Sequence, residues 1–295
     1  MISIANLAPV ERAVNNAAGM KRMISRFIAG DTLDEALRLA ATFQGKGIHS
    51  ALDLLGENVA DADEARAATD AYIDVLRGLR EAGSHSPYIS VKLTALGLDL
   101  SEETATINLK RILQAADGDF VRVDMEGSAY TEATLRIVRD LHSSHPNLGT
   151  VLQSCLYRTD ADLDDAIQQG IPIRLVKGAY AEPPTVAYPK KKDVDAAYRR
   201  QLAKLIGAHH PTAVASHDPE MIHEAKRLMR EHRIDNDLVD FQMLLGIRAD
   251  VRDGLLEEGY KVRTYIPFGS QWYPYFVRRL AERPANLLFV LKNLR

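Results

Sequence analysis

Eight short apolar runs alternate along the chain with amphipathic stretches of helical spacing, and this repeated order predicts an α/β fold around a parallel sheet. The count of eight, in a chain of 295 residues, predicts a (β/α)8 barrel of the TIM type, which typically needs about 250 residues. No tract has the composition of a linker or a repeat. We therefore expect one barrel domain, residues 46–295, behind an N-terminal helical extension, residues 1–45.

The N-terminal extension is predicted to be helical. Residues 19–30 and 33–43 place apolar side chains three and four positions apart, and Asp31 and Thr32 precede the second segment as candidate caps. From His49 onward the apolar runs become short and β-branched, as in buried strands. The predicted strands are residues 50–55, 88–95, 120–125, 149–155, 173–177, 212–216, 238–244 and 261–267.

A helix is predicted in each interval between these strands. Several intervals open with Asp, Ser, Thr or Pro and several close on Gly, which favours helix starts and ends there. A doubly wound open sheet is the alternative, but it usually has fewer strands and a Gly-rich first turn, which is missing here. The predicted helices are residues 61–82, 101–117, 131–144, 159–169, 194–209, 219–232 and 249–258, with a closing helix, residues 270–282, over the carboxyl ends of the strands.

The charges nearly balance, since 37 Lys and Arg stand against 40 Asp and Glu, for a net charge of -3. No global basic field is therefore available to bind nucleic acid, and a small molecule is the default partner. The N-terminus lacks the basic cluster of a signal peptide, and no apolar run approaches the roughly 18 residues of a membrane span, so at most a peripheral membrane contact is expected. Cys155, the only cysteine, is interpreted as a buried apolar residue of a cytoplasmic protein.

Polar residues gather at the carboxyl ends of the predicted strands, where parallel barrels carry their chemistry. Lys92, Asp124 and Arg174 stand in otherwise apolar strands and need polar partners, because an unpaired buried charge is costly. A structural Lys92–Asp124 salt bridge and a structural role for His217 are the plain alternatives. Recurrence on successive strands favours one polar pocket. The set is Glu57, Lys92, Asp124, Glu126, Gln153, Ser154, Arg174, Lys177, Ser216, His217, Asp218, Gln242 and Tyr265.

The closing helix adds a second group of polar residues. Tyr275 stands three and four positions before Arg278 and Arg279, so tyrosine and guanidinium groups share one helix face. Paired guanidinium forks suit a carboxylate, although surface arginines paired with Glu282 explain the pattern equally well.

Several chemistries stay open on these residues. A metal site is not expected, because the strand ends offer only one histidine. A Ser-His-Asp hydrolase lacks the expected G-x-S-x-G turn. A Schiff-base lyase with Lys92 or Lys177 as nucleophile is not excluded by spacing. The residues alone predict a barrel enzyme that acts on a small carboxylate.

Seven blocks of the chain resemble, in order, those of the proline dehydrogenase family. Arg-Leu-Val-Lys-Gly-Ala-Tyr at residues 174–180 and Tyr-x-x-Arg-Arg at residues 275–279 are the most specific, and the match runs from about residue 45 to the C-terminus. The resemblance implies a distorted barrel that binds FAD and oxidises L-proline to Δ1-pyrroline-5-carboxylate, with a quinone as electron acceptor. The other blocks are residues 88–94, 121–126, 215–217, 241–244 and 263–269.

The resemblance also implies substrate contacts. Arg278, Arg279 and Lys92 would clamp the proline carboxylate, which supplies orientation and compensates its charge. Asp124 would hold Lys92 in place and tune the charge of the site. The ring of proline would pack against Tyr265, Tyr275 and Leu244.

On the cofactor side, Arg174 would lie near flavin N5, where a cation stabilises the negative charge of the reduced ring. Gly178 and Ala179 would be small so that the backbone can approach the cofactor. The implied FAD contacts are Met125, Gln153, Arg174, Lys177, Gly178, Ala179, Ser216 and His217.

Four further expectations follow from the resemblance. Glu57 matches a family glutamate and would form a gate with Arg278 when substrate is bound. Asp218 stands where the family often has Asn, which places a carboxylate beside the site. Tyr265 favours proline over hydroxyproline, and the short C-terminus is expected of a monofunctional member.

Overall fold

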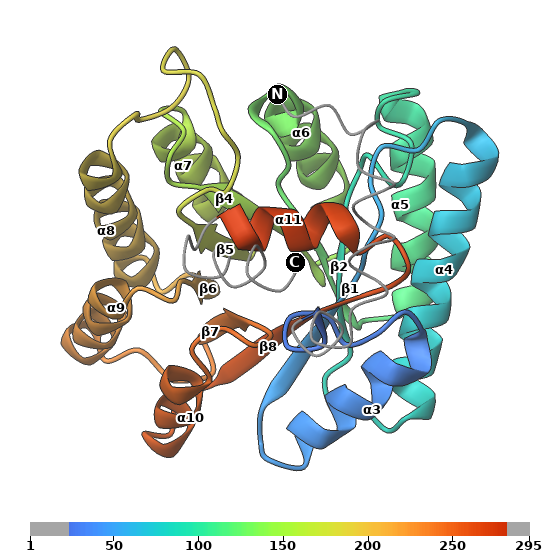
Figure 1. The fold of residues 1–295 in the computed structure, drawn as a ribbon. Helices are drawn as coiled ribbons and strands as arrows, with labels where there is room; N and C mark the ends of the chain where they lie inside the picture. The colour runs from blue at the N-terminus through green and yellow to red at the C-terminus, as the bar shows by residue number, and fades with distance from the viewer. Residues whose placement is uncertain (1–23, 282–295) are drawn as a thin grey trace, which may run out of the picture.

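The computed structural model describes residues 24–281, with side chains for residues 24–277. Its centre is a closed barrel of eight parallel strands that pair in chain order, with β8 returning to β1 (Figure 1). The predicted (β/α)8 barrel is therefore confirmed. The strands are β1 (His49–Leu54), β2 (Tyr88–Val91), β3 (Phe120–Val123), β4 (Leu148–Gln153), β5 (Ile173–Val176), β6 (Thr212–Ala215), β7 (Val239–Leu244) and β8 (Val262–Phe268).

Helices surround the barrel and connect successive strands (Figure 1). Within residues 24–281, helix α3 precedes β1, helix α11 follows β8, and a 3₁₀ turn, η2 (Ser128–Tyr130), lies in the loop after β3. The helices are α3 (Leu33–Gln44), α4 (Ala62–Glu81), α5 (Glu102–Ala116), α6 (Thr131–His142), α7 (Thr159–Gln169), α8 (Lys191–Gly207), α9 (Pro219–His232), α10 (Ala249–Glu257) and α11 (Tyr273–Ala281).

Capping side chains determine where several helices begin. Thr32 and Glu35 form a capping box at the start of α3. The Asp61 carboxylate accepts hydrogen bonds from two backbone amides of the first turn of α4, each at 2.9 Å. Asp218 caps α9, which has Pro219 in its first turn. These starts define the lengths of the loops at the carboxyl ends of the strands, where the candidate site lies.

The strands alternate between two environments. Ile89 and Val91 of β2 belong to the apolar core, which lies between the strands and the surrounding helices. Tyr88 and Ser90, on the opposite face of the same strand, contact Arg174 of β5 across the barrel interior. The interior is thus filled in part by charged side chains, whereas the shell around the barrel is apolar.

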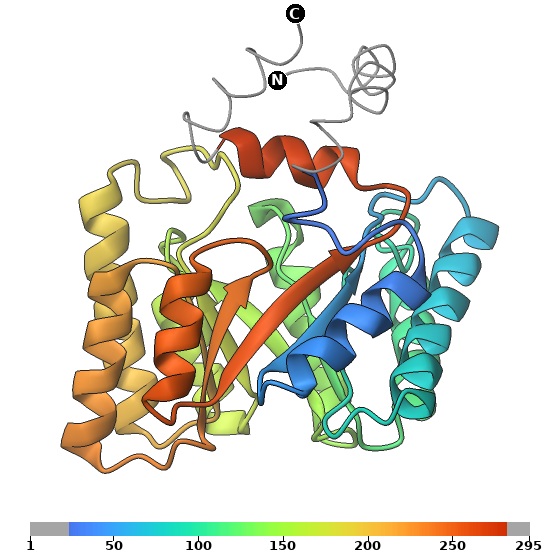
Figure 2. The same ribbon diagram turned by 60° about the horizontal axis from the view of Figure 1, so that its bottom comes forward.

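Helix α11 crosses the mouth of the barrel on the side toward which the strands point (Figure 2). A second apolar cluster fixes it there: Trp272 and Phe276 pack at 5.9 Å between ring centroids, and Phe27 lies 6.4 Å from Phe276. These aromatic contacts pack the start of the helix over the strand ends. The predicted closing helix is confirmed.

Element ends differ from the predictions by up to three residues in most places, and two segments differ more than that. β2 ends at Val91 rather than Ala95, because the chain turns at Leu93, whose carbonyl accepts the amides of Leu96 and Leu98. The second segment is the helix predicted for residues 19–30. In its described part only Ile24 is helical, and the amide of Ala29 donates to the carbonyl of Pro267 in β8. Residues 1–23 lie outside the described part of the chain.

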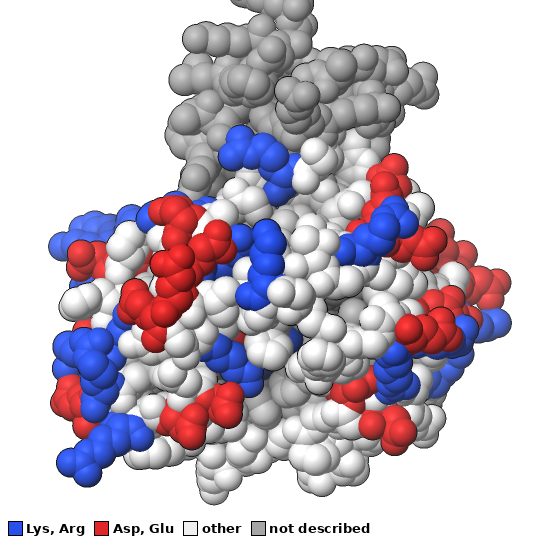
Figure 3. Space-filling view, turned by 90° about the horizontal axis from the view of Figure 1, so that it is seen from below, with Lys and Arg blue, Asp and Glu red and all other residues white. Residues whose placement is uncertain are grey.

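The surface carries both signs of charge. Figure 3 shows Lys and Arg interspersed with Asp and Glu on the face it presents, with uncharged areas between them. That face therefore offers no extended cationic surface of the kind that binds nucleic acid. None of the helices in residues 24–281 combines the length and the apolar composition needed to cross a bilayer.

Candidate active site

A cleft of about 430 Å³ opens at the carboxyl ends of the strands, and Tyr275 of α11 contributes to its wall. Glu57 does not line the cleft, and the side chains of Arg278 and Arg279 lie outside the described part of α11. The structure brings the other predicted contacts together in this one cleft: Lys92, Asp124, Met125, Gln153, Arg174, Lys177, Gly178, Ala179, Ser216, His217, Leu244, Tyr265 and Tyr275.

Lys92 is held by a residue that the sequence analysis did not single out. Its Nζ lies 2.6 Å from Oδ1 of Asp53, and the two side chains are only 9% and 1% exposed. The prediction that Asp124 holds Lys92 is wrong: β2 lies between β1 and β3, and Lys92 pairs with Asp53 on the β1 side, while the Asp124 carboxylate is taken by Arg174 and Tyr265. Burial alone would lower the pKa of Lys92, but the adjacent carboxylate raises it well above its usual value. Lys92 is therefore a fixed cation and a poor amine nucleophile.

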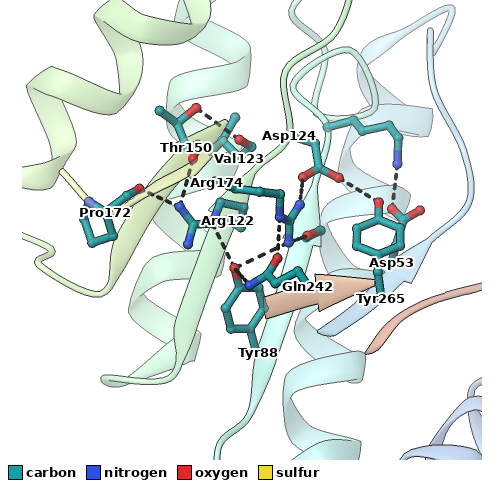
Figure 4. Close-up of polar contacts among 12 residues, drawn as sticks. Asp53, Tyr88, Arg122, Val123, Asp124, Thr150, Pro172, Arg174, Gln242 and Tyr265 are labelled. Atoms are coloured by element: carbon teal, nitrogen blue, oxygen red, sulfur yellow. Dashed lines mark hydrogen bonds and ion pairs between the residues drawn. The ribbon is translucent and has the colours of Figure 1, made fainter. Parts of the chain in front are cut away.

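Asp124 instead joins Arg174 and Tyr265 at the cleft wall (Figure 4). Arg174 donates from Nη1 to Oδ1 of Asp124 at 2.5 Å, and the Tyr265 hydroxyl donates to Oδ2 at 2.7 Å. On its other edge, Arg174 donates from Nε to Oε1 of Gln242 at 2.6 Å. Burial and the Asp124 carboxylate raise the pKa of Tyr265, so its hydroxyl stays a neutral donor. Arg174 is thus locked in one orientation.

His217 and Lys177 also have defined partners. Nε2 of His217 accepts the backbone amide of Leu244 at 2.9 Å, so a neutral imidazole carries its proton on Nδ1. Lys177 bridges the carboxylates of Asp195 and Asp218 at 2.5 and 2.6 Å. The extra carboxylate that the sequence places beside the site is therefore paired with a cation of that site.

Glu126, at the carboxyl end of β3, is a further buried acid of the cleft. Its carboxylate accepts the hydroxyl of Thr94 at 2.6 Å and the amide of Thr94 at 3.2 Å. Burial raises the pKa of Glu126, and the nearby charge of Glu57 adds to that effect. These contacts tie the turn after β2 to the end of β3.

Gly178 has a structural reason for lacking a side chain. Its φ is +110°, a region that L side chains rarely adopt, and a Cβ there would overlap Sγ of Cys155. Cys155 is half-buried, and burial raises the pKa of its thiol to about 11, so the thiol is neutral and serves as packing. The shape of the loop after β5 thus depends on the contact between Gly178 and Cys155.

Comparison with known proteins decides the family. Residues 36–292 match the family described as proline dehydrogenase. Proline dehydrogenase 2 of Bacillus subtilis (strain 168) is 38% identical over 278 residues, which cover 94% of this chain and 91% of the relative. Proline dehydrogenase of Deinococcus radiodurans is 38% identical, with 100% of this chain and 96% of the relative covered. This chain belongs to the proline dehydrogenase family.

Proline dehydrogenase sequences also occur within longer relatives. The bifunctional protein PutA of Escherichia coli (strain K12) is 26% identical, with 98% of this chain and 26% of PutA covered. The crystal structure of PutA from Bdellovibrio bacteriovorus, inactivated by N-propargylglycine, superposes with a TM-score of 0.81 and 25% identity over 88% of this chain and 32% of that protein. The proline dehydrogenase barrel described here corresponds to a part of these larger chains.

The cleft of this proline dehydrogenase family member has the chemistry that a flavin needs. Its walls combine apolar side chains, among them Met125, Val151 and Leu244, with the fixed cation of Arg174. An isoalloxazine has apolar faces and a polar edge that becomes negative on reduction, so apolar walls beside a held cation fit it. Within residues 24–281, no group of His, Cys, Asp and Glu is placed to hold a metal ion.

Four buried residues of the interior were missed as functional candidates: Asp53, Tyr88, Arg122 and Arg263. Each stands inside a short apolar strand, and each is at most 4% exposed. Asp and Arg are rarely buried without a partner, so their positions in the strands were a usable signal. Tyr88 gave no such signal, because tyrosine is common in strands.

Proposed function

We propose that this protein is an FAD-dependent proline dehydrogenase that oxidises L-proline to Δ1-pyrroline-5-carboxylate, with a quinone as the final electron acceptor. The proposal rests above all on one observation. Apart from Glu57, every predicted substrate or cofactor contact whose side chain is described lines a single cleft. Membership of the family supports the substrate, because the curated relatives are named proline dehydrogenases.

Of the three cations proposed to bind the substrate carboxylate, Lys92 is the one whose side chain the structure describes. It is fixed by Asp53 from within the barrel and faces the cleft with its protonated ammonium. Arg278 and Arg279 belong to α11, and by the family motif they would bind the same carboxylate together with Lys92. Cations on opposite sides of an anion orient it and compensate the cost of its burial. Tyr265, Tyr275 and Leu244 form the walls around the ring of proline.

The cofactor would be held on the side of the cleft formed by β3 to β6. When bound, FAD would accept the hydride that leaves C5 of proline. Arg174, held by Asp124 and Gln242, supplies positive charge at the edge of the ring, which favours the reduced cofactor. The residues proposed to contact FAD are Met125, Gln153, Arg174, Lys177, Gly178, Ala179, Ser216 and His217.

A gate formed by Glu57 and Arg278 remains part of the proposal. Glu57 follows β1, close enough for its charge to act on Glu126 at the cleft. An ion pair between Glu57 and Arg278 would hold α11 over the bound substrate. Glu57→Ala is then expected to raise the KM for proline without loss of FAD, and an unchanged KM would eliminate the gate.

Colour is the most direct test. The purified protein is expected to be yellow, and anaerobic proline is expected to bleach it, because the electrons pass from proline to the flavin. Arg278→Met should weaken proline binding by several kcal/mol, seen as a rise in KM, while the protein stays yellow. A Schiff-base lyase is the alternative: it would be trapped on Lys92 or Lys177 by borohydride with substrate and would show no bleaching by proline. The pairing of Lys92 with Asp53 argues against this alternative.

A further inference from the structure

Below the cleft, three arginines lie near one tyrosine in the barrel interior, and Figure 4 shows two of them, Arg122 and Arg174, beside Tyr88. The Cζ atoms of Arg263, Arg122 and Arg174 lie 4.3, 5.8 and 5.9 Å from the ring centroid of Tyr88. None of the four side chains belongs to a residue more than 5% exposed. Water therefore screens these charges little, and protein groups must compensate them.

The hydroxyl oxygen of Tyr88 faces hydrogen-bond donors. Arg122 donates to it from Nε at 2.9 Å, and Arg174 Nη2 and Gln242 Nε2 each lie 3.4 Å away. The amide of Gln242 cannot be reversed, because its Oε1 accepts from Arg174 and its Nε2 donates to Asp240 at 3.0 Å. Within residues 24–281, no acceptor is found for a proton on the Tyr88 oxygen.

If Tyr88 is neutral, one of the buried cations near it has no anionic partner. Lys92, Arg174 and Arg263 each have a carboxylate partner, provided by Asp53, Asp124 and Asp240 at 2.5 to 2.6 Å. Arg122 has no carboxylate partner in the described part of the chain: it binds Tyr88 and the carbonyls of Thr150 and Pro172. A guanidinium does not lose its proton in proteins, so one buried positive charge remains without an anion.

We propose that Tyr88 is a buried tyrosinate that compensates Arg122 and acts as a positioning residue for Arg174. An ionised phenolate accepts several hydrogen bonds and donates none, which is the pattern observed around the Tyr88 oxygen. Its negative charge compensates Arg122, the one guanidinium of the three around Tyr88 that has no carboxylate partner in the described part of the chain. It also lies directly behind Arg174, so it holds that side chain from below while Asp124 holds it from the cleft.

Two further groups lie close to Tyr88 and its arginines. Phe120 of β3, which carries no charge, stacks on the Tyr88 ring at 4.7 Å between centroids. Asp240 of β7 forms an ion pair with Arg263 at 2.6 Å. Burial alone would raise the pKa of Tyr88, but Arg122, Arg174 and Arg263 together outweigh it, so the pKa lies below the usual value. In contrast, burial raises the pKa of Tyr198, whose hydroxyl donates to a backbone carbonyl at 3.3 Å.

The ionisation is testable by NMR on the holoenzyme labelled with ¹³C at tyrosine Cζ. Of 11 tyrosines, one is expected to show the downfield Cζ resonance of a phenolate from about pH 6 to pH 9, where free tyrosine is protonated. Tyr88→Phe should remove this resonance, and the matched variant Tyr198→Phe should leave it in place. If Tyr88→Phe does not fold, Arg122→Met assigns the resonance by moving it upfield. Eleven protonated resonances over this range would overturn the proposal.

The effect on Arg174 is testable through the flavin and rests on the proposed function. Tyr88→Phe removes an anion behind Arg174, so the flavin midpoint potential is expected to become more positive. Arg122→Met in the same chain removes the unpaired cation and should return the potential toward that of the unmodified enzyme. A potential that does not change in Tyr88→Phe would overturn the positioning role. Absence of flavin would overturn the proposed function and leave the NMR result as the test of the tyrosinate.

Discussion

The Lys92–Asp53 ion pair makes a quantitative prediction about the floor of the cleft. The Nζ to Oδ1 distance is 2.6 Å, and at an effective dielectric constant of about 20 two unit charges at this distance attract by about 6 kcal/mol. Part of this energy offsets the desolvation of both groups. Asp53→Asn keeps the shape but leaves the Lys92 ammonium buried without an anion, and losses of about 3–5 kcal/mol are typical for such a change.

Asp70→Asn is the matched control. Asp70 lies 2.6 Å from Arg111, the same separation, but the Arg111 and Asp70 side chains are 39% and 56% exposed. Screening by water should limit its effect to about 1 kcal/mol or less. The assay is thermal unfolding followed by circular dichroism with excess FAD, in which the Asp53→Asn loss corresponds to a fall in Tm of roughly 6–20 °C.

Kinetics separates the two roles of the pair. Asp53→Asn should also raise the KM for proline, because Lys92 loses the contact that orients it toward the cleft. Replacing both partners, as Asp53→Leu with Lys92→Met, should recover stability but not proline binding, since apolar substitutes for a buried ion pair are often tolerated. The reasoning would be refuted if Asp53→Asn were no less stable than Asp70→Asn.

Three further substitutions test other contacts. Gly178→Ala forces a Cβ against Cys155 at a φ of +110°. The resulting strain of about 1–3 kcal/mol should raise the Kd for FAD about 5- to 150-fold in a fluorescence titration, with partial recovery when Cys155→Ala is added. Tyr265→Phe removes the 2.7 Å hydrogen bond to the Asp124 carboxylate. The loss of transition-state stabilisation, measured from kcat/KM for proline in steady-state assays, should be about 1.5–3 kcal/mol, and an unchanged kcat/KM would contradict a role for this hydrogen bond. Burial lowers the pKa of His210 from 6.5, so stability should be constant above about that pH and fall below it, and Tm against pH should be flatter on the acid side in His210→Gln.

The fold was predictable because its signals are local. Short β-branched runs placed all eight strands, and helices α7 and α9 begin and end where the sequence predicts. The end of β2 was not predictable, because Lys92 to Ala95 continue the apolar pattern of a strand while the chain turns at Leu93. The turn depends on the contact of Thr94 with Glu126, which lies 32 residues further along the chain.

The candidate site was predictable in its membership but not in its pairing. Strand alternation indicates that Lys92, Asp124 and Arg174 face the interior, because each stands in an apolar strand. Which of them touch depends on barrel closure and on side-chain reach across the interior. Asp53 and Lys92 come from adjacent strands, whereas Arg174 reaches Ser90 on a strand that is not its neighbour. Such cross-barrel contacts have no periodic signal in the sequence.

Arg174 links the two levels of this interior. Its Nη1 holds Asp124 at the cleft, while its Nε and Nη2 contact Gln242, Ser90 and Tyr88 below. A guanidinium with every edge engaged cannot rotate toward a ligand, so the ligand must come to it. The position and the field of this cation at the cleft therefore depend on Tyr88 and Ser90 of the barrel floor as well as on Asp124 and Gln242 of the cleft lining. Substitutions in the barrel floor are therefore expected to change activity through Arg174, as substitutions in the cleft do.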